Sequence, residues 1–201
     1  MTPDELNDLW RPERSDAVAA AIRAAVPPGL SGLDYGCGAE PVGLRLADHF
    51  ARLVLADASP DVVATLGDLI STQPSLAARV LDLTVTAAPE PVDCAFASMS
   101  FHHVRDIDAL LAGLARTIRP DGWLVVVDLD PDGGAFHHGG AIAREHDGFD
   151  RHRLAQTIAG HGFTVTDIAD AWRGNRCSGG EVITYSLFLI VARRRSVGGG
   201  A

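Results

Sequence analysis

Three acidic residues follow short apolar segments in the first half of the chain, and a glycine-rich turn comes directly after the first of them. Asp34 is followed by Gly36 and Gly38, while Asp57 and Asp82 end the next two apolar segments. Glycine tolerates positive φ and lets a ligand approach the main chain. A helix that begins after such a turn offers unpaired N–H groups. An ordinary strand-to-helix turn is one interpretation, and a site for a ligand with cationic and anionic parts is the other.

The spacing of these residues argues against a dinucleotide site. A G-x-G-x-x-G fingerprint needs a third glycine where this chain has Pro41, and Asp34 would repel a pyrophosphate. Asp57 lies 19 residues after Gly38, where an acid binds a ribose diol. Asp82 can accept a hydrogen bond from an adenine amino group. An adenosine with a charged amino-acid tail satisfies all three acids.

Apolar runs alternate with segments of helical spacing, which predicts a parallel sheet with helices on both faces. The expected strands are residues 30–35, 52–57, 79–82, 92–98 and 123–128. The expected helices are residues 3–26, with a break near residues 11–12 and a cap at Ser15, then 41–49, 59–70, 106–118 and 150–159. Ligands bind at the carboxyl ends of the strands in such sheets. Polar residues occupy these ends: Asp34, Asp57, Asp82, Ser98 and Asp128.

The end of the chain departs from this alternation. Residues 162–168 and 185–191 resemble strands with no helical segment between them, so we expect an antiparallel pair joined by residues 173–180. Arg173 and Arg176 lie in this link. We interpret them as part of a solvated turn, with attraction of an anionic acceptor as the alternative.

The motifs together resemble those of class I S-adenosylmethionine-dependent methyltransferases. Residues 33–38 resemble the family's first motif, residues 53–57 its ribose-binding strand end, and residues 80–83 its adenine-contact segment. Residues 96–104 resemble the "s-x-x-l-H-H-v" segment of small-molecule methyltransferases, including quinone-biosynthesis-like C-methyltransferases. Residues 114–124 resemble the segment that leads into the fifth strand.

This resemblance implies a three-layer, Rossmann-like α/β fold with a mostly parallel seven-stranded sheet, an antiparallel last strand and helices on both faces. It covers about residues 30–192. We therefore expect one methyltransferase domain over residues 1–192, in which residues 1–29 form a helical cover over a core at residues 30–192. Residues 193–201 are expected to form a flexible tail.

The resemblance implies S-adenosylmethionine as cofactor and S-adenosylhomocysteine as product. Asp34 would then lie near the methionine amino group. The backbone at Gly36, Cys37 and Gly38 would approach the amino-acid part, and Ser98 would contact the methionine part.

The adenosine part would be bound at the next two strand ends. Asp57 would hold the ribose hydroxyls, with Ala58 beside the adenine, and Asp82 and Leu83 would contact the adenine. Glu40 is a departure, because the family usually has glycine there. Its carboxylate would crowd or repel the carboxylate of the cofactor unless it points away.

Histidines near this edge are candidates for acid–base chemistry. A methyltransferase needs a general base only if the acceptor loses a proton as it attacks. Our candidate is His103, with His146 second, and structural or solvated histidines are the simpler alternative. A metal site of His102, His138 and His146 is conceivable, but no fixed ligand spacing supports it. We therefore expect no metal.

Composition limits the partners. The net charge of −9 argues against sequence-independent nucleic-acid binding, and no apolar run is long enough to span a membrane. The three cysteines are widely separated and form no disulfide or zinc pattern. The acidic N-terminus lacks the apolar core of a signal peptide, so a cytoplasmic location is expected.

The leading hypothesis is methyl transfer to a small molecule, because little of the chain lies outside the core to hold a larger substrate. The alternative is a non-catalytic or regulatory protein that binds S-adenosylmethionine or S-adenosylhomocysteine, and Glu40 motivates it. A nicotinamide-dependent oxidoreductase is the weakest alternative, because Pro41 and the paired last strands count against it.

Overall fold

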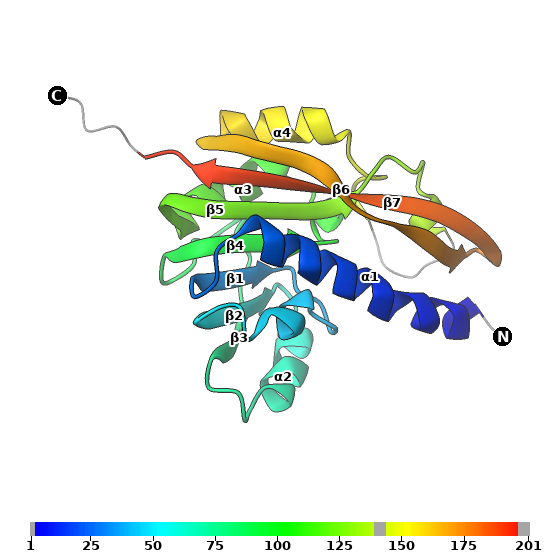
Figure 1. Cartoon of the computed structure of the whole chain (residues 1–201), viewed down its shortest axis with the longest axis horizontal. Coiled ribbons are helices and arrows are strands. Elements are labelled where there is room, and N and C mark those ends of the chain that lie inside the picture. Colours follow the sequence, from blue (N-terminus) through cyan, green and yellow to red (C-terminus); the bar gives the residue numbers. More distant parts are fainter. Residues whose placement is uncertain (1–2, 139–143, 197–201) are drawn as a thin grey trace.

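The computed structural model describes residues 3–138 and 144–196, in which helices flank a seven-stranded sheet (Figure 1). The helices are α1 (Pro3–Ala25), α2 (Pro60–Leu69), α3 (Ile107–Thr117) and α4 (Arg151–Gly160), with short 3-10 helices η1 (Val42–Leu46), η2 (Phe101–His103) and η3 (Ala135–His137). The strands are β1 (Ser31–Tyr35), β2 (Arg52–Asp57), β3 (Leu76–Val80), β4 (Val92–Ser98), β5 (Ile118–Leu129), β6 (Phe163–Ser178) and β7 (Glu181–Arg194).

The strands lie in the order β3-β2-β1-β4-β5-β7-β6. Strands β1 to β5 pair in parallel, whereas β7 runs antiparallel to both β5 and β6. The order reverses between β1 and β4, so the carboxyl ends of these two strands form the switch point at which ligands bind in such sheets. The predicted fold, a mostly parallel seven-stranded sheet with an antiparallel last strand, is confirmed.

Side chains of the central strands alternate between two apolar layers. Val125 and Val127 face the layer that contains residues of α1, η1 and α2, while Leu124 and Val126 face the layer that contains residues of α3 and α4. All four valine and leucine side chains are fully buried. Each contributes about 1.5–3 kcal/mol of transfer free energy. Burial on both faces explains why these strands are continuous apolar runs.

Helix α1 differs from the expectation at its middle. It continues through Pro12, where we expected a break, and Ser15 lies buried inside it instead of capping a second helix. Proline removes one helical hydrogen bond, but the turns that follow bury Val18 and Ile22 against the sheet, and this packing stabilises the longer helix. Within the described residues, no helix is long and apolar enough to cross a bilayer.

Two shorter elements also differ. The expected helix at residues 41–49 is only the five-residue 3-10 helix η1. The Leu44 N–H bonds to Pro41 O, and the Gly43 N–H bonds to the side chain of Asp34, so α-helical hydrogen bonds do not form at its start. Strand β3 begins and ends earlier than the expected residues 79–82. As a result Asp82 lies in the loop after the strand.

The last two strands are longer than expected. Residues 173–178, expected to belong to a linking turn, continue β6 in antiparallel register with β7. Only Gly179 and Gly180 remain as the turn. Figure 1 shows the distal half of this hairpin extending past the carboxyl end of β5. That extension brings β6 beside the amino-terminal half of α1.

Candidate active site

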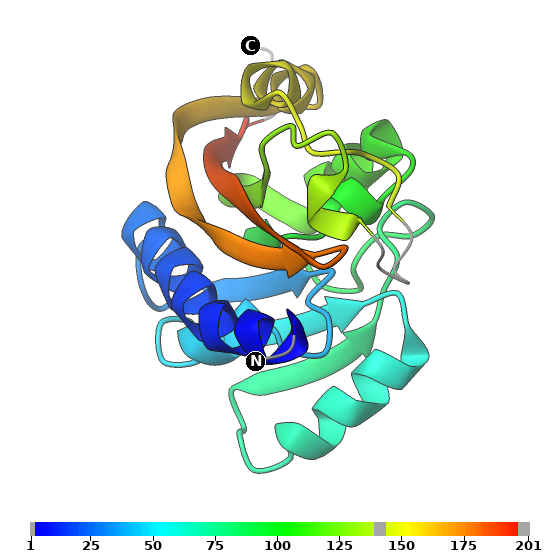
Figure 2. The same ribbon diagram turned by 90° about the vertical axis from the view of Figure 1, so that its right-hand side faces the viewer.

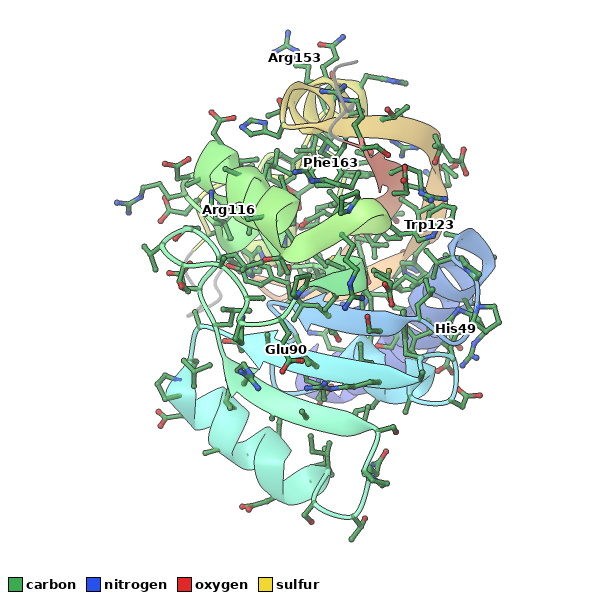
Figure 3. All side chains as sticks on the ribbon, turned by 90° about the vertical axis from the view of Figure 1, so that its left-hand side faces the viewer. His49, Glu90, Arg116, Trp123, Arg153 and Phe163 are labelled. Carbon is green, nitrogen blue, oxygen red and sulfur yellow. The ribbon has the colours of Figure 1, made fainter. Side chains whose placement is uncertain are left out.

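Strands β1, β2, β4 and β5 run parallel, and their carboxyl ends, which carry predicted site residues, lie at the edge that faces the viewer in Figure 2. Two cavities lie at this edge, one beside the glycine-rich turn and one beside the histidines of η2 and η3. Figure 3 shows the opposite edge, where Glu90 and Trp123 lie. The cavity there is smaller, about 90 Å³, and is lined by Glu90 with Arg52 and Arg119. The strand-end acids do not line it.

The glycine-rich turn is bonded to the end of β2. The N–H groups of Gly36 and Cys37 donate to Ala56 O at 2.8 and 3.1 Å, and the Gly38 N–H donates to Asp57 Oδ2 at 3.0 Å. Free N–H groups were expected at the start of the helix that follows, whereas the N–H groups of the turn itself already have partners. Backbone–backbone and backbone–carboxylate bonds use them to hold the turn in place.

Asp34 lies beneath the turn and is almost completely buried. Its Oδ2 accepts a hydrogen bond from Gly43 N at 2.9 Å. Burial raises the pKa of Asp34; the Gly43 N–H lowers it, the charge of Asp57 adds to the rise, and the net value is about 7. Burial and the same acids raise the pKa of the Cys37 thiol, so Cys37 is a poor nucleophile.

A cavity of about 190 Å³ lies above these residues, and we call it the glycine-turn pocket. Its walls come from α1, the turn, η1 and the end of β4. The predicted residues that line it are Asp34, Gly36, Cys37, Gly38 and Ser98.

The predicted adenosine residues lie beyond this pocket. Asp57 is partly exposed, and its Oδ1 accepts from Ser59 N at 2.9 Å. Ala58 is exposed. Asp82 Oδ1 accepts from both the N–H and the hydroxyl of Thr84, at 2.9 and 2.7 Å. Leu83, in contrast, is fully buried.

Glu40 lies on the rim of the glycine-turn pocket and pairs with helix α1. Arg11 Nη1 is 3.0 Å from each of its carboxylate oxygens. The pair is exposed, with 41% and 66% of the two side chains accessible, so it contributes little stability. The pair instead balances the negative charge of Glu40, the residue that replaces the usual glycine of the family.

The second cavity, of about 250 Å³, we call the histidine pocket. Arg14 and Met99 line both pockets, which makes them neighbours. Met99 has φ of 57°, which is rare for a residue with a side chain, and its N–H bonds to Val127 O at 2.8 Å. The lining residues are Asn7, Arg11, Arg14, Met99, His102, His103, Phe136, His137, Asn175, Arg176 and Tyr185.

Three histidines cluster in this pocket, and an acid at the end of β5 supports them. His102 Nδ1 lies 2.6 Å from Asp128 Oδ1, and His102 Nε2 lies 3.0 Å from His137 Nε2. The rings of His102 and His103 have centroids 4.1 Å apart. Burial, followed by the neighbouring His102 and His103, lowers the pKa of His137 to about 4, so His137 is neutral near pH 7.

The other two candidate histidines lie elsewhere. His146 Nε2 donates to Val104 O at 2.9 Å, and its ring packs on Phe149. The ring of His138 lies against Gly179 in the hairpin turn. The metal set weighed from the sequence, His102 with His138 and His146, is therefore not brought together.

Arginines give the histidine pocket a positive wall. Arg176 stacks on Phe136 with its guanidinium carbon 4.1 Å from the ring centroid, and its buried Nε has no hydrogen-bond partner among the described residues. Burial, and then the charge of Arg14, lower the pKa of Arg176. Arg173 is exposed and lies outside the pocket lining.

Sequence reasoning missed several residues of this pocket. Asn7 holds α1 to β6, because its amide nitrogen donates to Cys177 O at 3.1 Å and its amide oxygen accepts from Cys177 N at 2.8 Å. Nothing in the local sequence pairs positions that are 170 residues apart. The positive φ of Met99 also has no signal in its Ser-Met-Ser context.

This chain is similar to known proteins in both sequence and fold. A family model described as a methyltransferase domain matches residues 8–171. An uncharacterized methyltransferase of Schizosaccharomyces pombe, C1347.09, is 28% identical over 169 residues, or 77% of this chain and 56% of the relative. The chain thus spans just over half the length of that curated relative.

Solved methyltransferase structures share the fold at low identity. The TM-score is 0.71 to 1,6-didemethyltoxoflavin-N1-methyltransferase of Burkholderia thailandensis, with 18% identity over 96% of this chain and 84% of that one. It is 0.71 to an S-adenosylmethionine-dependent methyltransferase of Aquifex aeolicus (16% identity, 96% and 99%) and 0.69 to N-methyltransferase NodS of Bradyrhizobium japonicum (16%, 93% and 88%). The family match extends from α1 into β6 and includes every residue that lines the glycine-turn pocket, but not Asn7, Asn175, Arg176 and Tyr185 of the histidine pocket. The chain therefore belongs to the family of methyltransferase domains.

Proposed function

We propose that this protein transfers the methyl group of S-adenosylmethionine to a small, anionic acceptor by in-line displacement at the sulfonium. The observation that carries the proposal is the wall shared by the two pockets, formed by Met99 and Arg14. The donor occupies the glycine-turn pocket and the acceptor occupies the histidine pocket. Two cavities side by side bring reactants together, and such positioning supplies much of the rate enhancement in a displacement reaction.

The donor is held by the strand-end residues. Asp34 lies near the methionine ammonium, the backbone of Gly36, Cys37 and Gly38 forms the floor, and Ser98 contacts the methionine part. The structures of the Burkholderia and Bradyrhizobium enzymes named above contain S-adenosylhomocysteine, which supports this choice of cofactor.

The adenosine extends outward from there. Asp57 uses one lone pair on each oxygen for Gly38 and Ser59, and the remaining lone pairs accept from the ribose hydroxyls. Ala58 and Asp82 lie beside the adenine. Leu83 is buried, so its role is to support Asp82 from below, which differs from the direct contact that the family resemblance implies.

The acceptor carries a negative charge because its pocket presents guanidinium groups. Arg14 and Arg176 line it, and the Nε of Arg176 is buried without a partner among the described residues. A buried donor left unpaired costs about 1–3 kcal/mol. A carboxylate or phosphate on the acceptor would remove that cost, and the Burkholderia neighbour, whose structure contains 1,6-didemethyltoxoflavin, supports a small molecule.

His103 is the general base, because it lines the histidine pocket. His146, the second candidate, donates its Nε2 hydrogen to Val104 O and lies outside the lining of the pocket. A base must reach the proton that it removes. The location therefore favours His103.

The test begins with calorimetric titration of S-adenosylmethionine and S-adenosylhomocysteine, and no binding at about 1 mM sinks the donor assignment. A metabolite extract is then separated on an anion-exchange column, and each fraction is incubated with methyl-tritiated donor. We expect labelled product from the retained, acidic fraction. Label arising only from the unretained fraction contradicts an anionic acceptor.

Arg176→Ala is the matching variant, with Arg173→Ala, three residues away on β6, as its control. Loss of a charged hydrogen bond should raise the acceptor KM about ten-fold or more without changing the donor Kd. Arg173→Ala should leave both unchanged, because Arg173 lies outside the pocket lining. Equal effects of the two variants contradict a specific role for Arg176.

A non-catalytic binding protein is the other candidate, and Glu40 was its motive. The pairing of Glu40 with Arg11 supports catalysis instead, since a neutralised carboxylate does not repel the cofactor. Binding of S-adenosylmethionine with no product from any fraction would favour the non-catalytic alternative.

A further inference from the structure

Three imidazole rings from two short 3-10 helices converge in the histidine pocket. His102 and His103 belong to η2 and His137 to η3, and one ring nitrogen of each lies within 4.8 Å of the other two. The closest pair, His102 Nε2 and His137 Nε2, is 3.0 Å apart. Nitrogens bound at about 2.0–2.1 Å to one metal ion lie about 2.8–3.0 Å apart at neighbouring octahedral positions and about 3.3–3.4 Å apart in tetrahedral geometry. This pair therefore already has the separation of two ligands.

We propose that His102, His103 and His137 bind a divalent transition-metal ion in the histidine pocket. His103 is the only partly buried member, and its ligand nitrogen already lies within 4.8 Å of the other two. The proposal reverses the expectation from sequence that the protein holds no metal. It also changes the ligand set, because His103 and His137 replace His138 and His146.

Asp128 supplies the partner that metal-binding histidines usually have. Its Oδ1 lies 2.6 Å from His102 Nδ1, and both side chains are buried. A carboxylate on Nδ1 holds the proton there and leaves the Nε2 lone pair directed at the cluster. Asp128 is itself oriented by the N–H groups of Leu129 and His102, at 2.7 and 3.3 Å. Asp128 is thus a positioning residue.

The ligand atoms select the class of metal. Three imidazole nitrogens suit Zn²⁺, Co²⁺, Ni²⁺ or Cu²⁺, whereas Mg²⁺ and Ca²⁺ prefer oxygen ligands. Three protein ligands leave coordination positions open, as in catalytic zinc sites. The pocket of about 250 Å³ has room for a further ligand at these positions.

The positive charge of the pocket predicts that this further ligand is an anion. Arg14 and Arg176 line the same cavity, so a dication raises an already positive potential. Binding of the metal together with an anion offsets this cost. The metal's role rests on the proposed function and takes the place of the base: a metal-bound His103 has no free lone pair to accept a proton. The ion would instead bind an oxygen or sulfur of the acceptor, next to the Met99 wall, and lower the pKa of that group.

The test uses untagged, full-length protein, because a histidine tag binds the same metals. After removal of metal with EDTA and dialysis, the protein is titrated with ZnCl₂, CoCl₂ and MgCl₂ in a calorimeter. We expect one Zn²⁺ per chain with a Kd of about 1 μM or tighter, d–d absorption bands with Co²⁺, and no binding of Mg²⁺.

Variants assign the ligands. His102→Ala, His103→Ala and His137→Ala should each weaken Zn²⁺ binding about 100-fold or more, and Asp128→Asn about 10- to 100-fold. His152→Ala, an exposed histidine on α4, is the control and should bind as the wild type does. Titration of S-adenosylmethionine into each variant reports whether the donor site is folded. His103→Ala removes the least buried ligand and keeps the test valid if the other variants fail to fold.

The outcomes separate the two proposals. Absence of saturable Zn²⁺ and Co²⁺ binding by the wild type at about 1 mM overturns the metal site, as does binding that survives in all three histidine variants. Metal binding with no affinity for S-adenosylmethionine contradicts the proposed function and leaves the metal site standing.

Discussion

Arg11 Nη1 of helix α1 lies 3.0 Å from both carboxylate oxygens of Glu40, at the end of the glycine-rich turn. This contact joins α1, which covers the pockets, to Glu40, the position at which methyltransferases of this family usually have glycine. Asn7 makes the corresponding contact between α1 and β6, through Cys177. Helix α1 is therefore held at both sides of the paired cavities.

The Arg11–Glu40 pair predicts a non-additive effect on cofactor affinity. Arg11→Ala leaves the Glu40 charge unpaired and should weaken binding of S-adenosylmethionine about three- to ten-fold, whereas Glu40→Gln alone should change it by less than about three-fold. The double variant should bind like Glu40→Gln. Calorimetry of all four proteins completes the cycle. A double variant as weak as Arg11→Ala would mean that Glu40 is not the cause.

Asp34 predicts how stability changes with pH. Its folded-state pKa is about 7, above the ordinary value of 3.8, so between these pH values the folded protein holds a proton that the unfolded chain has released. The unfolding free energy should therefore fall as pH rises from about 4 to about 7 and change little above that. Urea unfolding across this range should show the slope in the wild type and lose it in Asp34→Asn. An unchanged slope would place the titration at another group.

Asp34 also leads to opposite predictions for stability and for cofactor binding. Asp34→Asn should be more stable than the wild type at pH 8, because it avoids a buried charge. It should also bind S-adenosylmethionine more weakly if Asp34 faces the ammonium group, and binding by the wild type should tighten as pH rises through 7. Equal affinity of the variant at pH 8 removes Asp34 from the proposed donor site.

Gly36 is the turn position least able to accept a side chain. It has φ of 67°, and an added Cβ would lie 2.6 Å from Ser100 Cβ. Gly36→Ala should therefore destabilise by about 3 kcal/mol, from both backbone strain and overpacking. Gly38→Ala is the matched control, because φ is 65° but nothing lies within 4 Å, and it should cost about 1 kcal/mol. Urea midpoints measure the difference, and equal losses contradict the role of Ser100.

The two candidate bases predict different kinetics. His103→Ala should lower kcat about ten-fold or more while the donor Kd stays unchanged. His146→Ala should keep kcat within about two-fold, because its Nε2 bonds to Val104 O outside the pocket. Steady-state rates with the acceptor from the acidic fraction test this. A larger loss in His146→Ala than in His103→Ala would reverse the assignment.

The fold was predictable because its signals are local and repeated. Apolar runs such as residues 92–98 can be buried on both faces only in a covered parallel sheet, and β4 spans the same residues. Caps were equally clear: Asp106 and Asp150 accept hydrogen bonds from the first turns of α3 and α4. In both cases one stretch of sequence contains all the interacting groups.

The rest depends on contacts between distant segments. Pro12 indicated a break in α1, but the packing of Val18 and Ile22 keeps the helix continuous. The start of β3 was not predicted, because it contains alanines, which do not favour strands. Arg176 was expected in a solvated turn, because nothing near it in the sequence indicates that its guanidinium stacks on the ring of Phe136. Five predicted residues line the glycine-turn pocket, but the partners of the turn's N–H groups were not predicted, since Asp57 and Ala56 belong to the next strand.

The long β6–β7 hairpin has a consequence for how such a protein diversifies. The glycine-turn pocket is built from α1, β1, η1 and β4, whereas Asn175, Arg176 and Tyr185 of the hairpin reach only the histidine pocket. Changing the side chains of the hairpin's distal half alters the lining of one cavity and not of the other, as long as the backbone of Cys177 keeps its bonds to Asn7 of α1. Selection can thus retune what is modified without rebuilding what supplies the methyl group, and a library confined to residues 173–185 is the economical starting point for changing specificity.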